Sequence, residues 1–351
     1  PLPCVLGNAY DAQDAMRSHL RKATTVVCMA NTNPIVDNEE TLRYVLEEGK
    51  KTGIHVLSCA AVSKGFAGRE LTDMEGLLAA GAAGFTDDGI PLMEGTFVRE
   101  AMEEAARLDT VLSFHEEDKH FIRENGINHG RISDELGIYG SPALAEDSLV
   151  ARDCMIALDT GATVDIQHIS SGHSVEMVRL AKELGAKVWA EVTPHHLWFA
   201  GTEYRVNPPI REAADVAALV EAIRDGTVDA IATDHAPHSD EDKAKGAAGM
   251  VGLETAFAVC YTKLCRQEGL ELYYLSALMS RFPAAILGLA GKGRVEVGAD
   301  ADLTLVELDT PFTVDREALH SKSRNCPYHG LTLYGRVDAT IKGGRLTYRR
   351  K

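Results

Sequence analysis

Five predicted strands of this chain run directly into side chains that can bind a metal ion. Each strand is a short apolar run, and the polar residues stand at its C-terminal end. The strand ends are residues 84–86 before Asp87 and Asp88, 111–114 before His115, 164–167 before His168, 188–192 before His195 and His196, and 228–233 before Asp234 and His235. In a (β/α)8 barrel the C-terminal ends of the strands face one pocket, where residues far apart in the sequence meet. The pattern therefore predicts an enzyme site at the mouth of such a barrel.

Strands and helices alternate from residue 24 onwards, which predicts a parallel sheet covered by helices. We expect strands at 24–29, 55–62, 82–86, 110–114, 163–169, 187–192 and 228–232. Helices are expected at 39–51, 71–80, 93–107, 144–158, 175–184, 213–224, 253–265 and 275–287. The predicted fold class is therefore α/β, a (β/α)8 TIM-like barrel that occupies residues 1–290.

After residue 291 the sequence changes to short runs typical of β-hairpins, at 295–300, 303–306 and 339–347. Gly343 and Gly344 stand between two alternating runs, and a Gly-Gly pair in that position is a strong signal for a hairpin turn. We expect residues 291–351 to form a small C-terminal β domain, the remnant of a β-sandwich, packed on the barrel.

Charge and cysteine content argue against several classes of protein. The formal net charge is -16, and the 36 basic residues form no run except Arg349, Arg350 and Lys351, which disfavours nucleic acid and anionic membranes as partners. The seven cysteines are scattered without Cys-x-x-Cys spacing, as expected of reduced thiols. No apolar stretch approaches the roughly 18 residues of a membrane-spanning helix, and the first residues show no signal-peptide pattern. We expect a cytoplasmic protein.

The strand-end residues supply the ligand set of a hydrolytic zinc centre. Such a centre needs neutral imidazoles and carboxylates aimed at one point, and Asp88, His115, His168 and Asp234 offer them from four strand ends. Zinc lowers the pKa of its water towards roughly 7, and a carboxylate at the edge of the metal moves the proton. Asp234 suits that role. We expect all four side chains within one metal site.

Each of these residues also has a purely structural interpretation. A lone histidine at a strand end is more often a satisfied core or loop residue, and Asp87-Asp88-Gly89 is also a common turn sequence. The joint occurrence of four such strand ends favours the metal site. His195 and His196 are expected to pack beneath the site and orient it.

Five segments resemble those of class I bacterial dihydroorotases, members of the amidohydrolase superfamily. They are Met-Ala-Asn-Thr-Asn-Pro at 29–34, Phe-Thr-Asp-Asp-Gly at 85–89, Glu-Val-Thr-Pro-His-His at 191–196, Asn-Pro-Pro-Ile-Arg at 207–211 and Ala-Thr-Asp-His-Ala-Pro-His at 232–238. The resemblance extends from about residue 24 to the C-terminus. It implies reversible cyclisation of N-carbamoyl-L-aspartate to L-dihydroorotate in pyrimidine synthesis.

The resemblance also implies a role for each matched residue. Asp88 would bridge two zinc ions, with His115 and His168 binding one of them. Asp234 would bind the other zinc and act as the general acid and base. Asn31 and His238 would hold the substrate carboxylate, and Asn207 would contact the pyrimidine ring. The expected partners are a small-molecule substrate, a second copy in a homodimer and, in one alternative, aspartate transcarbamoylase.

Two other functions remain open on the sequence. One is a different cyclic-amide hydrolase, since hydantoinases and allantoinases resemble this pattern overall. They use a carbamylated lysine as the bridge and lack the Asp-His-Ala-Pro-His ending, which favours the dihydroorotases. The other is a catalytically impaired, dihydroorotase-like subunit that scaffolds a partner such as aspartate transcarbamoylase.

The chain departs from the family at its first barrel strand. The family has His-x-His followed shortly by an arginine there, whereas residues 3–10 read Pro-Cys-Val-Leu-Gly-Asn-Ala-Tyr. The intervals from there to Thr24, from His196 to Asn207 and from His238 to Gly252 are also short. Either the sequence lacks N-terminal strands and loops, or the site is trimmed, with at most one zinc on Asp88, His115 and His168. We expect that the sequence lacks these segments, because a barrel without its first strand exposes a sheet edge.

Overall fold

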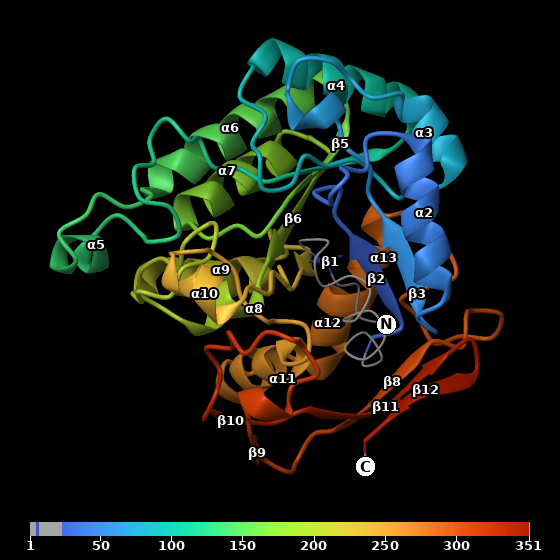
Figure 1. Cartoon of the computed structure of the whole chain (residues 1–351), viewed down its shortest axis with the longest axis vertical. Helices are drawn as coiled ribbons and strands as arrows, with labels where there is room; N and C mark the ends of the chain where they lie inside the picture. The colour runs from blue at the N-terminus through green and yellow to red at the C-terminus, as the bar shows by residue number, and fades with distance from the viewer. Residues whose placement is uncertain (1–4, 7–22, 351) are drawn as a thin grey trace. The chain divides into compact units, whose positions relative to one another are not determined.

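The computed structural model describes residues 5–6 and 23–350 (Figure 1). They form two compact units that interleave along the sequence. The middle unit comprises Met29–Arg43 and Ser58–Asp229, and the terminal unit comprises the described residues of Pro1–Cys28, Tyr44–Leu57 and Ala230–Lys351. Each unit has its own strands and helices.

The helices fall between the strands through most of the chain. They are α2 (Glu39–Lys50), α3 (Met74–Ala80), α4 (Gly95–Leu108), α5 (Arg131–Glu135), α6 (Ala143–Thr160), α7 (Gly172–Glu183), α8 (Pro194–Trp198), α9 (Ala213–Asp225), α10 (Asp240–Ala244), α11 (Ala256–Cys260), α12 (Leu272–Ser276) and α13 (Phe282–Ile286). Shorter or wider helical segments are η3 (Lys64–Phe66), η4 (Tyr261–Gln267), η5 (Ala277–Arg281) and η6 (Arg316–Ala318). None of the helices in the described residues is both long and apolar enough to cross a membrane.

The strands are short. They are β1 (Val5–Leu6), β2 (Thr25–Cys28), β3 (His55–Ser58), β4 (Val111–Phe114), β5 (Thr163–Ile166), β6 (Val188–Val192), β7 (Ala230–Ile231), β8 (Leu303–Glu307), β9 (Phe312–Thr313), β10 (Thr332–Leu333), β11 (Arg336–Lys342) and β12 (Arg345–Arg349).

Parallel strands form the centre of the middle unit. β4 pairs with β5 and β5 with β6, both in parallel, and single parallel bridges continue the series from Leu112 to Phe85 and from Phe85 to Ala60. Of the expected strand at 82–86, only Phe85 forms bridges, one to each of these neighbours. Since parallel neighbours share one direction, the residues after 86, 114, 166 and 192 emerge at the same edge. This edge carries the candidate site.

Helices between these strands make the crossovers that parallel pairing requires. α4 and α7 both pack on α6, and α6 and α7 lie side by side in Figure 1. α4 buries the apolar side chains of Phe97, Val98, Ala101, Met102 and Ala105, the spacing of one helix face. It ends at Leu108, and the left-handed backbone of the next residue, Asp109 (φ 51°), turns the chain towards β4.

The terminal unit contains three separate sheets among its described residues, one of them the antiparallel pair of β9 and β10. β1, β2 and β3 are neighbours in that order, with β1 parallel to β2. At the C-terminus β8, β11 and β12 form an antiparallel sheet with β11 in the middle. The predicted hairpin is confirmed: Gly343 (φ 54°) and Gly344 (φ 78°) join β11 to β12, a conformation that glycine adopts without strain.

The expected β-structure at 295–300 is wrong. The chain makes a turn there, closed by a hydrogen bond from Ala299 N to Glu296 O. Gly298 has a positive φ of 93°, which breaks an extended run. Val295 and Val297, the apolar residues that suggested a strand, are exposed instead.

Candidate metal site

Two of the predicted ligands stand on strained backbone. His168 (φ 36°) follows β5 and Asp234 (φ 42°) follows β7, and among the described residues only Phe66 and Asp109 are other non-glycine positions with positive φ. Such conformations cost about 1–3 kcal/mol each and cluster at functional sites, because the surrounding structure must hold them. The strain therefore marks both strand ends independently of their side-chain chemistry.

Three predicted ligands meet at the strand ends of the middle unit. One ligand atom each from Asp88, His115 and His168 lies within 4.8 Å of the others. The Nδ1 atom of His115 is 3.1 Å from the Nε2 atom of His168, and their rings meet edge to face at 83°. Asn31 donates a hydrogen bond from Nδ2 to Asp88 Oδ2 at 3.0 Å. The cluster thus gathers residues from four separate parts of the sequence.

The electrostatics of the cluster suit a cation. Burial lowers the pKa of His168 well below its usual value, so its imidazole is neutral and keeps a lone pair. Burial raises the pKa of Asp88, and His115 and Asn31 oppose that rise by favouring the carboxylate. Two nitrogen ligands of one tetrahedral zinc lie about 3.3 Å apart when each bond is about 2.0 Å. The observed separation of the two imidazole nitrogens is close to that value.

Glu117 supports His115 from outside the cluster. Its Oε2 lies 3.3 Å from His115 Nε2, and its Oε1 accepts a hydrogen bond from Ser141 Oγ at 3.1 Å. A proton on Nε2 shared with this carboxylate leaves the lone pair on Nδ1, the atom that faces His168. Carboxylates commonly orient metal-binding histidines in this way. The sequence prediction missed Glu117, although an acidic pair directly after a strand-end histidine was a signal for it.

Asp87 has a structural role beside Asp88. Its carboxylate accepts hydrogen bonds from Val62 N at 2.8 Å and Ser63 N at 3.1 Å, and from the Ser63 hydroxyl. Burial raises its pKa to about 6, against the effect of these donors. Its carbonyl accepts from Ile90 N at 2.9 Å, around Gly89 with φ 79°. The segment Asp87-Asp88-Gly89 is thus a turn, as its sequence also indicated. The same turn places Asp88 in the metal-binding cluster.

His195 and His196 are both buried, with ring centroids 4.4 Å apart. His196 Nε2 donates to Pro208 O at 2.9 Å, and Nδ1 accepts from Thr193 Oγ1 at 2.8 Å. Burial lowers the pKa of His196 to about 4, so it stays neutral and ties the chain beside Asn207 to α8. Neither nitrogen of His195 has a hydrogen-bond partner among the described residues.

The predicted substrate-binding residues differ in which of their polar side-chain atoms already have a hydrogen-bond partner. The side-chain oxygens of Asn31 and Asn207 are buried and accept no hydrogen bond within the described part of the chain. Unpaired buried oxygens of this kind suggest a missing partner such as a ligand. The amide nitrogen of Asn31, however, already donates to Asp88, so this residue supports a predicted ligand in addition to any contact with substrate.

Asp234 and His238 belong to the terminal unit. Between them, His235 is buried and accepts hydrogen bonds at Nδ1 from Gly252 N (3.1 Å) and Leu253 N (3.3 Å), so its role is structural. The carbonyl of His238 accepts from Ser323 Oγ at 2.6 Å. Of the segment at 3–10 where the family has His-x-His, only Val5 and Leu6 belong to the described residues.

Comparisons with known proteins identify the family. The family described as Dihydro-orotase-like matches residues 12–174, and the Amidohydrolase family matches residues 158–348. A dihydroorotase of Clostridioides difficile (strain 630) is 49% identical over 336 residues, which cover 93% of this chain and 79% of that protein. One of Clostridium acetobutylicum is 43% identical over 339 residues, 93% of this chain and 80% of that protein. This chain belongs to the dihydroorotase family.

Solved structures confirm the fold class predicted for this dihydroorotase family member. An L-hydantoinase (dihydropyrimidinase) from Arthrobacter aurescens superposes with a TM-score of 0.84 at 22% identity, covering 96% of this chain and 79% of that one. A D-hydantoinase (dihydropyrimidinase) from Thermus sp. gives 0.81 at 20% identity, with 99% and 83% covered. At these identities the likeness concerns the fold alone, an amidohydrolase α/β barrel with a small C-terminal β domain.

Proposed function

We propose that this protein is a dihydroorotase, which reversibly cyclises N-carbamoyl-L-aspartate to L-dihydroorotate. The observation that carries the proposal is the 49% identity to a dihydroorotase over 93% of the chain. The cluster of Asp88, His115 and His168 supports it independently, because a hydrolase of cyclic amides needs a centre that activates water.

Zinc is the metal we propose, as one or two ions. Neutral imidazoles with a carboxylate are ligands that zinc favours. Asp88, His115 and His168 would hold one ion, and Asp234 with Asp88 would hold a second. When bound, the metal would polarise the amide carbonyl and lower the pKa of water.

The side chains around the cluster have separate tasks in this proposal. Asn31 holds the Asp88 carboxylate through its amide, and Glu117 fixes the ring of His115. His196 holds the Pro208 carbonyl and so positions Asn207 for the pyrimidine ring. In the hydrolytic direction Asp234 takes a proton on its carboxylate and passes it to the ring nitrogen that leaves. His238 holds the substrate carboxylate.

A substrate comparison tests this function directly. We expect the zinc-loaded full chain to hydrolyse dihydroorotate and to prefer it over hydantoin and allantoin in kcat/KM. Faster turnover of hydantoin or allantoin would favour the other cyclic-amide hydrolases. Zinc bound at the cluster without turnover of any of the three would favour a scaffold subunit, which co-purification with aspartate transcarbamoylase would then test.

The remaining features of the proposal concern assembly and location. We propose that the protein forms a homodimer. If it is a scaffold subunit, we propose that it associates with aspartate transcarbamoylase. The division into a barrel at 1–290 and a β domain at 291–351 also remains a proposal, which limited proteolysis near residue 290 tests. We place the protein in the cytoplasm because all the cysteines among the described residues are free thiols, as expected in a reducing compartment.

A further inference from the structure

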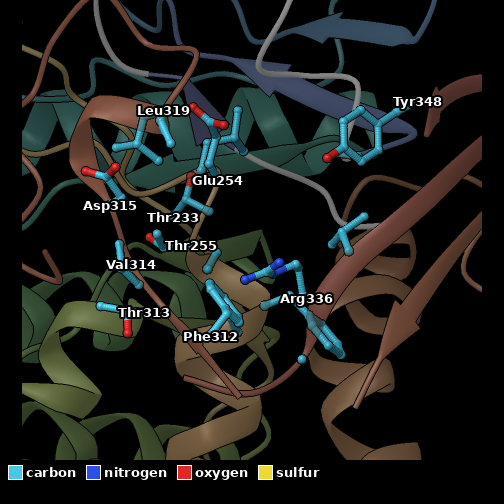
Figure 2. A pocket seen from close by; sticks show the side chains of 18 of the residues that line it. Thr233, Glu254, Thr255, Phe312, Thr313, Val314, Asp315, Leu319, Arg336 and Tyr348 are labelled. Carbon is cyan, nitrogen blue, oxygen red and sulfur yellow. The ribbon is translucent and has the colours of Figure 1, made fainter. Parts of the chain in front are cut away.

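A cavity of about 260 Å³ lies within the terminal unit, and none of the residues assigned above to metal or substrate lines it. Figure 2 shows it between Thr233, the segment at Glu254 and Thr255, strand β9 and the start of β11. Its wall is largely apolar, with side chains that include Leu253, Phe257, Met279, Phe312, Val314 and Val337. Apolar cavities with a few polar groups are the usual form of small-molecule sites.

Arg336 is the polar group that distinguishes this cavity. Its guanidinium lies over the ring of Phe312, 4.4 Å from the ring centroid, and points into the cavity towards Thr255 (Figure 2). Within the described part of the chain it makes no hydrogen bond or ion pair with any side chain. Stacking uses one face of a guanidinium and leaves its in-plane N–H donors open. A half-buried cation without such partners is costly unless an anion joins it.

The acidic residues of the wall are engaged elsewhere. Glu254 accepts hydrogen bonds from His320 N at 2.8 Å and lies 2.9 Å from His320 Nδ1. Asp315 is exposed and accepts from Glu317 N at 3.0 Å. Neither carboxylate neutralises Arg336, so the cavity presents one positive charge surrounded by apolar surface.

Gly335 fixes the entry of Arg336 into the cavity. Its backbone has φ 85°, and a β-carbon there would lie 3.1 Å from Phe257 Cε1 and 3.0 Å from Tyr261 Cδ1. The absence of a side chain lets the chain pass close to these rings. The next residue is thereby set over Phe312, which makes the position of Arg336 a built feature of β11.

We propose that this cavity binds a compact apolar monocarboxylate, with the carboxylate on Arg336 and the apolar body against Leu253, Phe257 and Val314. The volume lies below the roughly 300–1,000 Å³ of pockets that enclose drug-sized molecules, so a single ring with one carboxylate is the fitting size. The ligand acts as an effector of the enzyme, and this second step rests on the proposed dihydroorotase function.

The link to the enzyme runs through Thr233, which lines the cavity and directly precedes Asp234. A β-carbon on Gly252 would lie 2.9 Å from the Thr233 carbonyl oxygen, so these two backbones are in close contact. Gly252 and Leu253 also donate to His235, on the other side of Asp234. A ligand that presses on Leu253 and Thr255 therefore acts on the contacts that hold Asp234 in its left-handed conformation.

Calorimetric titration of the full chain with benzoate tests the binding site. We expect one benzoate per chain, no binding of the uncharged benzamide, and much weaker binding of acetate, which lacks the ring. Arg336→Gln should weaken benzoate binding at least about 10-fold, the loss expected for hydrogen bonds to a charged group. Arg345→Gln, an exposed arginine outside the cavity, is the matched control and should bind benzoate like the parent.

A second variant tests whether a loss of benzoate binding comes from misfolding rather than from a change in the cavity. Ala318 is exposed at the rim of the cavity, so Ala318→Trp should block it while leaving the thermal midpoint unchanged. Loss of benzoate binding in this variant supports the site. Benzoate binding that survives both Arg336→Gln and Ala318→Trp, or benzamide binding as tight as that of benzoate, overturns it.

Dihydroorotate turnover with and without benzoate tests the effector role. We expect saturating benzoate to change kcat or KM by about fivefold or more in the parent and in Arg345→Gln, a typical coupling between two sites, and to have no effect in Arg336→Gln. An equal response in Arg336→Gln would mean that benzoate acts at the catalytic site, and overturns the effector role. Benzoate binding that depends on Arg336, in a chain that turns over no dihydroorotate, would refute the proposed function and leave the cavity site standing.

Discussion

The Nδ1 atom of His115 and the Nε2 atom of His168 face each other at 3.1 Å, although 53 residues separate them in the sequence. Burial holds His168 neutral, so one of its ring nitrogens keeps a lone pair, and Glu117 lies at the other nitrogen of His115. A cation between the two facing nitrogens would be bound by both rings. The pair therefore indicates a cation site more strongly than either histidine alone.

We expect His168→Ala to reduce zinc affinity by more than the roughly 10–100-fold that loss of an outer supporting residue costs. One of the nitrogens aimed at the metal is then gone. Equilibrium dialysis of the full chain with zinc measures the effect. The matched control is His173→Ala, whose side chain is 83% exposed. Equal zinc affinity in the two variants would remove His168 from the metal site.

Glu117→Gln is expected to act through His115. The amide keeps the size of the side chain and loses the charge that draws the Nε2 proton, so zinc affinity should fall about 10–100-fold. Turnover should recover in excess zinc with KM unchanged, a pattern that general loss of stability does not produce. Glu135→Gln, at an exposed glutamate paired with Arg131, is the control. A rate that stays low at saturating zinc would contradict a positioning role.

The sequence predicted the strand ends better than the strands themselves. Periodicity and strand length placed β4, β5 and β6 within a few residues, because each is a short, mostly buried run with apolar residues next to one or two polar ones. Of the strand expected at 82–86, only Phe85 forms bridges, one to Leu112 and one to Ala60. The chain turns directly after it, where the Asp87 carboxylate accepts hydrogen bonds from Val62 N and Ser63 N. The local sequence Asp87-Asp88-Gly89 did indicate a turn, but it did not show which backbone groups hold the Asp87 carboxylate.

The residues of the candidate site were also predicted from the sequence only in part. Asp88, His115 and His168 were found because parallel strands bring their C-terminal ends together, whatever the sequence between them. Glu117 was missed although the acidic pair after His115 was a signal for it, whereas the bond of His196 to Pro208 depends on side-chain directions that spacing does not encode. The cavity beside Arg336 is another example, because its wall comes from segments far apart in the sequence.

His196 should make the protein sensitive to acid. Its pKa is about 4 in the folded chain and about 6.5 when unfolded, so between these values only the unfolded chain binds the proton. The contribution of His196 to the free energy of unfolding should therefore fall as the pH drops from about 6.5 towards 4, by about 2 kcal/mol at pH 5. Urea unfolding at pH 7.5 and pH 5 measures this.

The variant His196→Gln isolates that contribution, since Gln retains an N–H for Pro208 and does not titrate. It should lose about 2 kcal/mol less than the parent over the same pH range. His120→Gln, at a side chain that is 70% exposed, should behave like the parent. Identical slopes in the parent and in His196→Gln would show that other groups cause the acid sensitivity.

Asp234→Asn should separate metal binding from proton transfer. The amide no longer carries a proton to the leaving nitrogen, so kcat should fall by at least about 10²-fold, while zinc bound at Asp88, His115 and His168 largely remains. Metal analysis and turnover on the same sample measure the two effects. Asp240→Asn, at an exposed residue of α10, is the control. Near-normal turnover in Asp234→Asn would mean that another group moves the proton.

The two predicted contacts to the substrate carboxylate should behave differently when removed. His238→Ala should weaken dihydroorotate binding by about 1.5–3 kcal/mol, the range for hydrogen bonds to a charged group, and leave zinc affinity unchanged. Its thermal midpoint should barely move, because only the backbone carbonyl of His238 bonds to Ser323.

Asn31→Ala should weaken substrate binding as well, and should also lower zinc affinity, because Asn31 donates to Asp88. Substrate titration and zinc dialysis of both variants, with His120→Ala as control, measure the difference. Dihydroorotate binding as tight as in the parent for both variants would show that the pocket does not hold this substrate, and would favour the alternative hydrolase or the scaffold.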